Sequence, residues 1–113
     1  MRIGVTSQNF RTITGHAGKT RRFLVYEPGE TGEPVEVERL DLPKEMAMHQ
    51  FRGDDHPLFS LDLLVTAGCG EGFVRRLGTY GVQVVVTGEQ DPVTAVSRLL
   101  RGESLAPPSR PDH

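Results

Sequence analysis

The chain has 113 residues, of which 36% are hydrophobic and 25% charged, a composition typical of one soluble domain with a single core. Its formal net charge is −2, and its basic residues form only one short cluster, Lys19, Arg21 and Arg22. This cluster is too short for nucleic-acid binding, which needs an extended basic face. A lone cysteine excludes an intrachain disulfide, and no apolar run approaches the roughly 20 residues of a membrane span. We therefore expect a cytoplasmic protein that binds neither nucleic acid nor membrane.

The first half of the chain has the pattern of three antiparallel strands. Residues 2–7 and 21–27 are apolar runs rich in branched and aromatic side chains. Residues 34–42 alternate apolar and charged side chains, which is typical of a half-exposed strand at the edge of a sheet. Short turns join the three segments, so the pattern predicts an antiparallel meander.

The second half changes to a strand, helix, strand rhythm. After a short helix and loop over 43–57, residues 61–68 form a continuous apolar strand. The spacing then predicts a helix over 71–81, a strand over 82–88 and a final amphipathic helix over 91–102.

These elements predict one α/β domain over residues 1–103 with a mixed five-stranded sheet flanked by helices. Strands joined by a helical crossover run parallel, so the sheet combines the antiparallel meander with a parallel β-α-β unit. Residues 104–113 are rich in proline, and we expect a disordered tail in which His113 is a solvated side chain.

The carboxyl ends of four strands meet at one edge of this sheet, which is where ligands usually bind in open α/β sheets. The turn Gly68-Cys69-Gly70 lies there, between a strand and a helix, where backbone N–H groups can hold an anion. The alternative is that its glycines only permit a tight turn. A thiol at a helix amino terminus tends to have a lowered pKa, so Cys69 could bind a soft metal, or it could be a small apolar plug.

Three histidines differ in their surroundings. His16 lies on a glycine-rich turn before the second strand, which favours an exposed ligand over a core residue. His49 follows two methionines and could be either a ligand or part of a packed face, whereas His56 precedes a proline and fits a turn. We predict that His16, His49 and Cys69 are candidate metal ligands at one edge, and that Lys19 and Arg22 complement an anionic ligand.

Hydrolytic chemistry has little support in the sequence. The first strand carries no carboxylate that could hold magnesium for phosphodiester cleavage. The sequence also lacks the G-x-S-x-G pattern of a serine nucleophile and a Cys-x-x-Cys pair.

The segments "RIGVTSQ", "ITGHAGKTRRFLVYE", "LDLLVTAGCGEGFVRRLGTYGVQVVVTG" and "DPVTAVSRLLRGE" together resemble the dinitrogenase iron-molybdenum cofactor biosynthesis family. This family includes the NifX and NafY proteins and the carboxyl-terminal part of NifB, and the resemblance extends from about residue 2 to residue 103. It implies a ribonuclease-H-like domain that carries an iron-sulfur cofactor or its precursor without catalysis. Position 17 is alanine where the family pattern has phenylalanine. The residues that match the pattern are Ser7, His16, Gly18, Gly68 and Gly70.

The sequence therefore predicts a non-enzymatic carrier of an iron-sulfur cluster or an iron-molybdenum cofactor precursor, held at the carboxyl edge of the sheet. Its partners would be the proteins that donate and accept this metallocofactor, and the exposed third strand could support a homodimer. The alternative hypothesis is an enzyme or sensor that binds a small phosphorylated or carboxylated metabolite at the glycine-rich turn.

Overall fold

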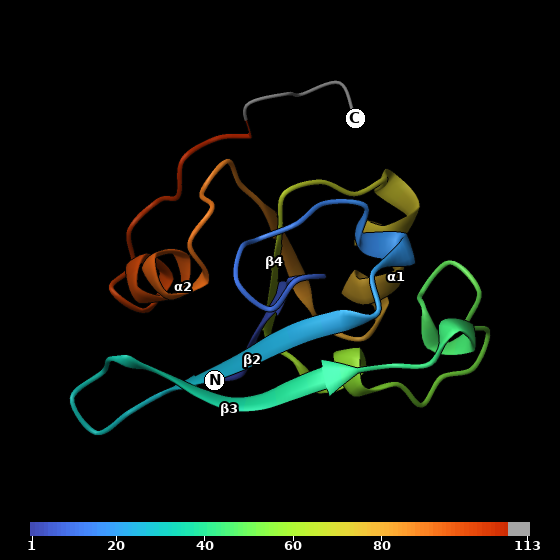
Figure 1. Ribbon diagram of the computed structural model, residues 1–113, viewed down its shortest axis with the longest axis horizontal. Helices are drawn as coiled ribbons and strands as arrows, with labels where there is room; N and C mark the ends of the chain where they lie inside the picture. Colours follow the sequence, from blue (N-terminus) through green and yellow to red (C-terminus); the bar gives the residue numbers. More distant parts are fainter. Residues whose placement is uncertain (109–113) are drawn as a thin grey trace.

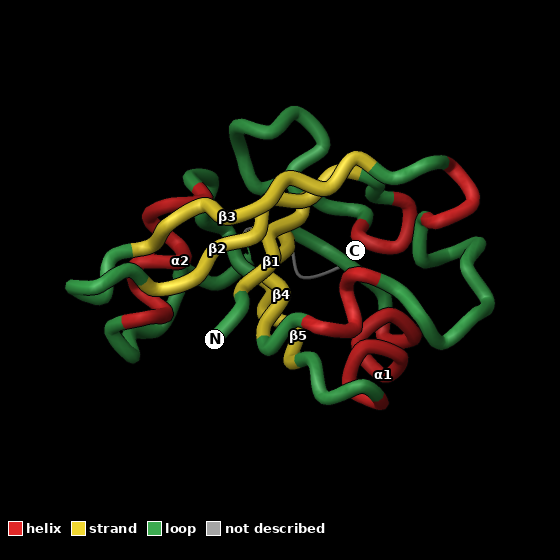
Figure 2. The backbone as a smooth tube through the Cα atoms, turned by 90° about the horizontal axis from the view of Figure 1, so that it is seen from below, coloured by secondary structure: helices red, strands yellow, loops and turns green. Residues whose placement is uncertain are grey.

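A mixed five-stranded sheet separates two α-helices in the computed structural model, which describes residues 1–108 (Figure 1). The strand order across the sheet is β3-β2-β1-β4-β5. Figure 2 shows the two helices on opposite sides of the sheet. The elements in chain order are β1 (Ile3–Thr6), β2 (Arg22–Pro28), β3 (Pro34–Asp41), β4 (Leu63–Thr66), α1 (Glu71–Thr79), β5 (Gln83–Val86) and α2 (Pro92–Leu100).

The strand pairing confirms the predicted topology. β2 pairs antiparallel with β1 and with β3, which is the meander, and β4 pairs parallel with β1 and with β5. β3 lies at the edge of the sheet, as its alternating charge pattern predicts. The strands β1, β3, β4 and β5 run in the same direction, so their carboxyl ends meet at one edge.

Both faces of the sheet are covered, and the side chains of β2 show how. Phe23 and Val25 join the core cluster on the α1 face, whereas Leu24 and Tyr26 join the cluster on the α2 face. Because successive side chains of a strand point to opposite faces, a strand covered on both sides needs a continuous apolar run. This is why residues 23–26 carry no charge.

Several predicted boundaries shift at the carboxyl edge. The strand predicted over 61–68 ends at Thr66, because the next residues leave the sheet and bond to another loop. The predicted helices are shorter by one or two residues at their ends, and α1 stops at Thr79. The segment 43–57 contains only a short 3₁₀ turn, Lys44–Met46, followed by a second one over Pro57–Ser60.

The segment after α2 returns to the sheet. Leu105 packs against the core cluster on the α2 face. The Ala106 carbonyl accepts hydrogen bonds from Gly88 N–H (3.0 Å) and Thr87 Oγ1–H (2.7 Å). One apolar side chain and one carbonyl of the segment 104–108 thus have partners in the fold. Residues 109–113, with His113, lie outside the described residues. Over residues 1–108, no helix is both long and apolar enough to cross a membrane.

His56 fixes the loop that leads into β4. Its side chain is only 4% exposed, and its Nδ1 accepts a hydrogen bond from Leu58 N–H (3.0 Å). An unprotonated Nδ1 requires the proton on Nε2, which donates to the Met46 carbonyl (2.8 Å). The ring also meets Phe51 edge-on, with centroids 4.9 Å apart. Burial lowers the pKa of His56, and the nearby Arg76 charge adds to the lowering, so the expected role in a turn fits the structure.

We predict that His56 makes folding stability depend on pH. Because its pKa in the folded state lies below the ordinary 6.5, the unfolded chain binds the proton first as the pH falls. The stabilisation is complete above pH 6.5 and is lost as the pH falls through the lower, folded-state pKa. Urea unfolding at pH 8 and pH 5.5 measures this loss.

The matched variant is His56→Asn, because asparagine can still accept the Leu58 N–H bond at the start of the turn. At pH 8 this variant should lose about 1 kcal/mol, the scale of one buried hydrogen bond. It should also show a smaller loss between pH 8 and 5.5 than the parent chain. An equal pH dependence in both proteins would contradict this account.

Candidate functional site

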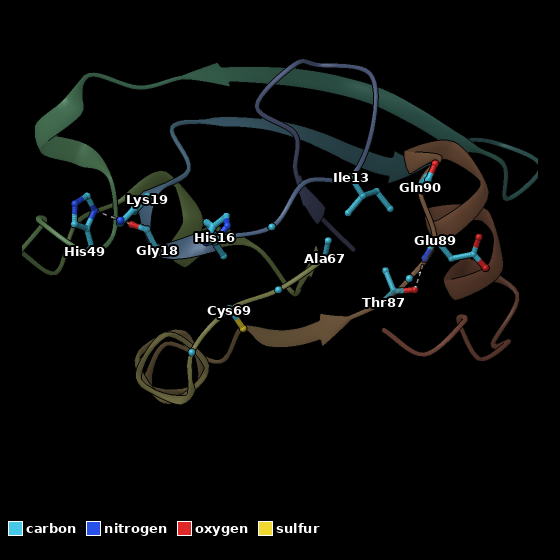
Figure 3. A pocket seen from close by; sticks show the side chains of 15 residues that line it. Ile13, His16, Gly18, Lys19, His49, Ala67, Cys69, Thr87, Glu89 and Gln90 are labelled. Carbon is cyan, nitrogen blue, oxygen red and sulfur yellow. Dashed lines mark hydrogen bonds between the residues drawn. The ribbon is translucent and has the colours of Figure 1, made fainter. Parts of the chain in front are cut away.

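A cavity of about 700 Å³ opens at the carboxyl edge of the sheet (Figure 3). It lies between the loop after β1, the turn after β4 and the loop after β5. The predicted site residues that line it are His16, Gly18, Lys19, His49, Gly68, Cys69 and Gly70. The structure therefore brings together most of the residues that the sequence placed at this edge. The remaining lining residues are Ile13, Gly15, Ala17, Ala67, Thr87, Gly88, Glu89 and Gln90.

Two walls of the cavity are bonded to each other through their backbones. Ala67 N–H donates to the Thr14 carbonyl (3.1 Å), and Ala17 N–H donates to the Gly68 carbonyl (3.1 Å). These two bonds attach the loop that carries His16 to the turn that carries Cys69. This confirms that the two loops share one rim.

A buried network of threonine hydroxyls strengthens the same junction. Thr6 Oγ1 donates to the Thr14 carbonyl (2.6 Å) and lies 2.9 Å from Thr66 Oγ1. Thr66 Oγ1 in turn accepts from Gly68 N–H (3.3 Å). The sequence analysis missed Thr14 and Thr66. The signal that could have found Thr66 is a threonine at the end of each of two neighbouring parallel strands, Thr6 on β1 and Thr66 on β4. Thr14 takes part through its backbone carbonyl, which no side-chain pattern reveals.

His16 is held by its backbone and leaves its ring free. It lies in the left-handed region (φ 53°, ψ 51°) just before a 3₁₀ turn, η1 (Ala17–Lys19), and its side chain makes no capping hydrogen bond. Its carbonyl accepts from Lys19 N–H (2.9 Å) and Thr20 Oγ1–H (3.1 Å). Left-handed backbone costs a non-glycine residue about 1 kcal/mol, and such strain is often found at functional positions.

His49 lies at one end of the cavity with one ring nitrogen engaged (Figure 3). The Gly18 carbonyl is 2.9 Å from His49 Nδ1 and accepts the backbone N–H of His49 as well (2.8 Å). Because a carbonyl can only accept, Nδ1 carries a proton, and in the neutral ring Nε2 keeps a lone pair. Met48 is the packed residue of this segment and is 3% exposed, whereas His49 is exposed. Met48, and not His49, is therefore the side chain of this segment that packs into the core.

Cys69 corrects one prediction. Burial raises the pKa of its thiol above the ordinary value near 9.0, whereas the helix terminus suggested a lowered pKa. The side chain is half-buried and packs against the core cluster on the α1 face, and this loss of hydration disfavours the charged thiolate. Cys69 lines the cavity as a protonated thiol.

The turn around Cys69 offers free backbone donors. Within residues 1–108, no hydrogen bond uses the N–H groups of Cys69 and Gly70. A Cβ atom added to Gly70 would meet nothing within 4 Å, so the backbone there is open to an approaching ligand. Both N–H groups precede α1, whose amino terminus carries partial positive charge.

The predicted metal ligands share the cavity without forming a complete site. The described part of the chain contains no group of three or more His, Cys, Asp or Glu side chains placed to hold a metal ion. His16, His49 and Cys69 therefore do not converge as one ligand set, because they come from three loops along the length of the cavity (Figure 3).

Ser7 and Arg22 do not line the cavity. Ser7 is fully buried, and its Oγ donates to the Thr12 carbonyl (2.7 Å), so it shapes the loop after β1. Arg22 pairs with Asp41 (3.4 Å) and lies over the ring of Phe10, 5.2 Å from its centroid. Of the two predicted cations, only Lys19 faces the cavity.

Comparison with known proteins identifies the family. The sequence model of the family described as "Dinitrogenase iron-molybdenum cofactor" matches residues 1–102. The chain belongs to this family. Membership in the dinitrogenase iron-molybdenum cofactor family associates the chain with the biosynthesis of that cofactor.

Solved structures share the fold. A candidate dinitrogenase (mj0327) from Methanocaldococcus jannaschii has a TM-score of 0.67 at 12% identity, covering 98% of this chain and 97% of that one. The protein PH0822 has a TM-score of 0.65 at 17% identity, covering 93% and 94%. A candidate NifB protein (TM1290) from Thermotoga has a TM-score of 0.58 at 16% identity, covering 93% and 91%. No curated protein sequence matches the chain. The predicted mixed five-stranded α/β fold is thus confirmed.

We predict that the Cys69 thiol reacts slowly with iodoacetamide at neutral pH. Its raised pKa leaves little thiolate, so alkylation at pH 7.5 should be severalfold slower than in the denaturant-unfolded chain. The rate in the folded protein should still be rising at pH 9. Mass spectrometry of timed samples measures it, and a plateau below pH 8 would show that the pKa is lowered instead.

Proposed function

We propose that this chain is a non-enzymatic carrier of an iron-sulfur cluster or an iron-molybdenum cofactor precursor, which it holds in the cavity at the carboxyl edge. One observation carries the proposal. Three side chains with nitrogen or sulfur donors, His16, His49 and Cys69, line a single 700 Å³ cavity together with free backbone N–H groups. Soft sulfur and imidazole ligands suit iron in such cargo, and N–H donors suit its sulfides.

Each element of the cavity has a role in this proposal. The His16 ring has no capping bond and can bind an iron atom reversibly. The N–H groups of Cys69 and Gly70 can donate to an anionic cluster, and the Lys19 ammonium adds positive charge. Cys69 can become a second ligand when iron displaces the proton from its thiol.

An incomplete ligand set suits a carrier, because the cargo has to leave. A site with three or four fixed ligands would hold a metal firmly, whereas scattered ligands on separate loops allow another protein to compete for it. The partners in this proposal are the protein that donates the metallocofactor and the protein that accepts it.

A second candidate function uses the same turn. The free N–H groups of Cys69 and Gly70 would also suit an enzyme or sensor that binds a phosphorylated or carboxylated metabolite. Thermal unfolding separates the two candidates, since only the ligand that binds the folded protein stabilises it. Stabilisation by sugar phosphates, with none by a cluster donor, would favour the second candidate.

We predict that replacing His16 lowers cluster uptake without lowering stability. His16→Gly removes the imidazole and also relieves the left-handed strain, so the unfolding free energy should stay unchanged or rise by up to about 1 kcal/mol. Anaerobic mixing with a cluster donor, followed by visible absorption and iron analysis, should show severalfold weaker uptake than in the parent chain.

The control is His16→Asn, because asparagine tolerates the left-handed region and retains a polar side chain but has no imidazole. It should lose uptake to a similar extent. Full uptake in both variants would show that the imidazole is not a ligand and would leave the carrier proposal without its leading residue.

A further inference from the structure

A second, smaller pocket of about 250 Å³ lies next to the cavity. Gly18 and His49 line both, so they form the wall between them. The smaller pocket contains arginine side chains and no carboxylate. Its lining residues, which define the arginine pocket, are Gly18, Met48, His49, Arg52, Gly72, Phe73 and Arg76.

Arg76 extends from α1 and is held in one orientation. Its Nη1 donates to the Met48 carbonyl (2.8 Å), and its guanidinium lies 5.8 Å from the centroid of the Phe51 ring. A guanidinium group has five N–H donors in a fixed plane. One contact through Nη1 therefore orients the group and leaves donors on its other nitrogens.

Arg52 approaches the same pocket from the loop before the 3₁₀ turn Pro57–Ser60. Its Nη1 donates to the carbonyls of His49 and Phe51, each at 3.2 Å. Asp54 and Asp55 follow closely in the sequence, yet within residues 1–108 no carboxylate lies within 4.0 Å of Arg52 or Arg76.

This absence contrasts with other arginines of the chain. Carboxylate partners are found for Arg2, Arg22, Arg39, Arg98 and Arg101. Within residues 1–108, Arg11, Arg21 and Arg75 also have none, but they line neither pocket. The two arginines that share a pocket are thus oriented by backbone carbonyls, which do not neutralise their charge. Two oriented and uncompensated guanidinium groups form a site that favours a negative charge.

We infer that the arginine pocket binds a small oxyanion, a phosphate or carboxylate group, at a site separate from the cavity. Guanidinium groups bind both kinds of group through paired N–H···O bonds. Met48 and Phe73 supply an apolar wall beside the two guanidinium groups. The inference does not depend on a metallocofactor, because Arg52 and Arg76 do not line the cavity.

The test is an NMR titration of the metal-free protein with inorganic phosphate in low-salt buffer. We expect saturable shifts of the backbone amides of Gly72 and Phe73 that sodium chloride at equal ionic strength does not reproduce. A second titration, carried out in the same way with malonate, tests whether the pocket binds a carboxylate. Tighter binding of phosphate or of malonate identifies which group the pocket prefers, and either result supports the inference.

The variants are Arg52→Gln and Arg76→Lys, with Arg75→Gln as the matched control. Arg75 is the neighbour of Arg76 on α1 but lines neither pocket. Each of the first two variants should weaken binding about tenfold, since a charge-assisted contact is lost, whereas the control should bind as the parent does. Arg52→Gln keeps the test valid if Arg76→Lys loses its bond to Met48 and folds poorly.

Unchanged phosphate binding in Arg52→Gln, or a loss of equal size in Arg75→Gln, would overturn the inference. Loss of phosphate binding in His16→Asn with no loss in Arg52→Gln would also overturn it, because the anion would then lie in the cavity. Neither result bears on cluster uptake, which is measured separately, so a failure here is distinct from a failure of the carrier proposal.

Discussion

The candidate site depends on the bonds that join the loop after β1 to the turn after β4. Two backbone hydrogen bonds, Ala67 to Thr14 and Ala17 to Gly68, cross between these segments, and the hydroxyls of Thr6 and Thr66 are buried at the junction. Each such bond contributes about 1 kcal/mol, but a buried polar group left without its partner costs more. The junction is therefore formed as a unit, and it fixes two walls of the cavity while the side chains on them stay free to bind.

The three histidines differ in how many of their ring nitrogens are engaged in supporting the fold. Both ring nitrogens of His56 are bonded within a buried loop, and one ring nitrogen of His49 is bonded to the Gly18 carbonyl. The ring of His16 makes no capping bond, and its backbone is strained. His56, with both nitrogens engaged, does not line the cavity, whereas His49 and His16 do. A histidine with both nitrogens engaged cannot bind a metal without breaking the loop that it supports.

The sequence predicted the fold well because hydrophobic periodicity reports directly on which faces of each strand are covered. The run from Phe23 to Tyr26 is apolar on both faces, and β3 is apolar on only one, which placed β2 inside the sheet and β3 at its edge. The rule that ligands bind at the carboxyl edge then located the cavity. These inferences need only the local hydrophobic pattern of each strand and the rules for how consecutive strands are connected.

The errors concern properties that depend on distant parts of the chain. Arg22 is at the correct edge, but its partner Asp41 lies on the neighbouring strand, and that pairing turns it away from the cavity. The raised pKa of Cys69 depends on how deeply its side chain packs on the core, which no spacing of residues reveals. The threonine junction was missed for the same reason, since Thr14 and Thr66 are far apart in sequence.

The two ends of the cavity differ in whether their hydrogen-bond donors are already engaged. At the end formed by the loop after β5, Gly88 N–H and the Thr87 hydroxyl are already bonded to the Ala106 carbonyl, and the Glu89 carboxylate pairs with Arg98 (3.8 Å). At the other end, toward α1, the N–H groups of Cys69 and Gly70 have no partner within the described chain. The segment that bonds to the first end follows the part matched by the family, which stops at residue 102. Because the donors at the first end are engaged, the open N–H donors lie at the end toward α1. The carrier proposal therefore expects an anionic ligand to bind at that end of the cavity.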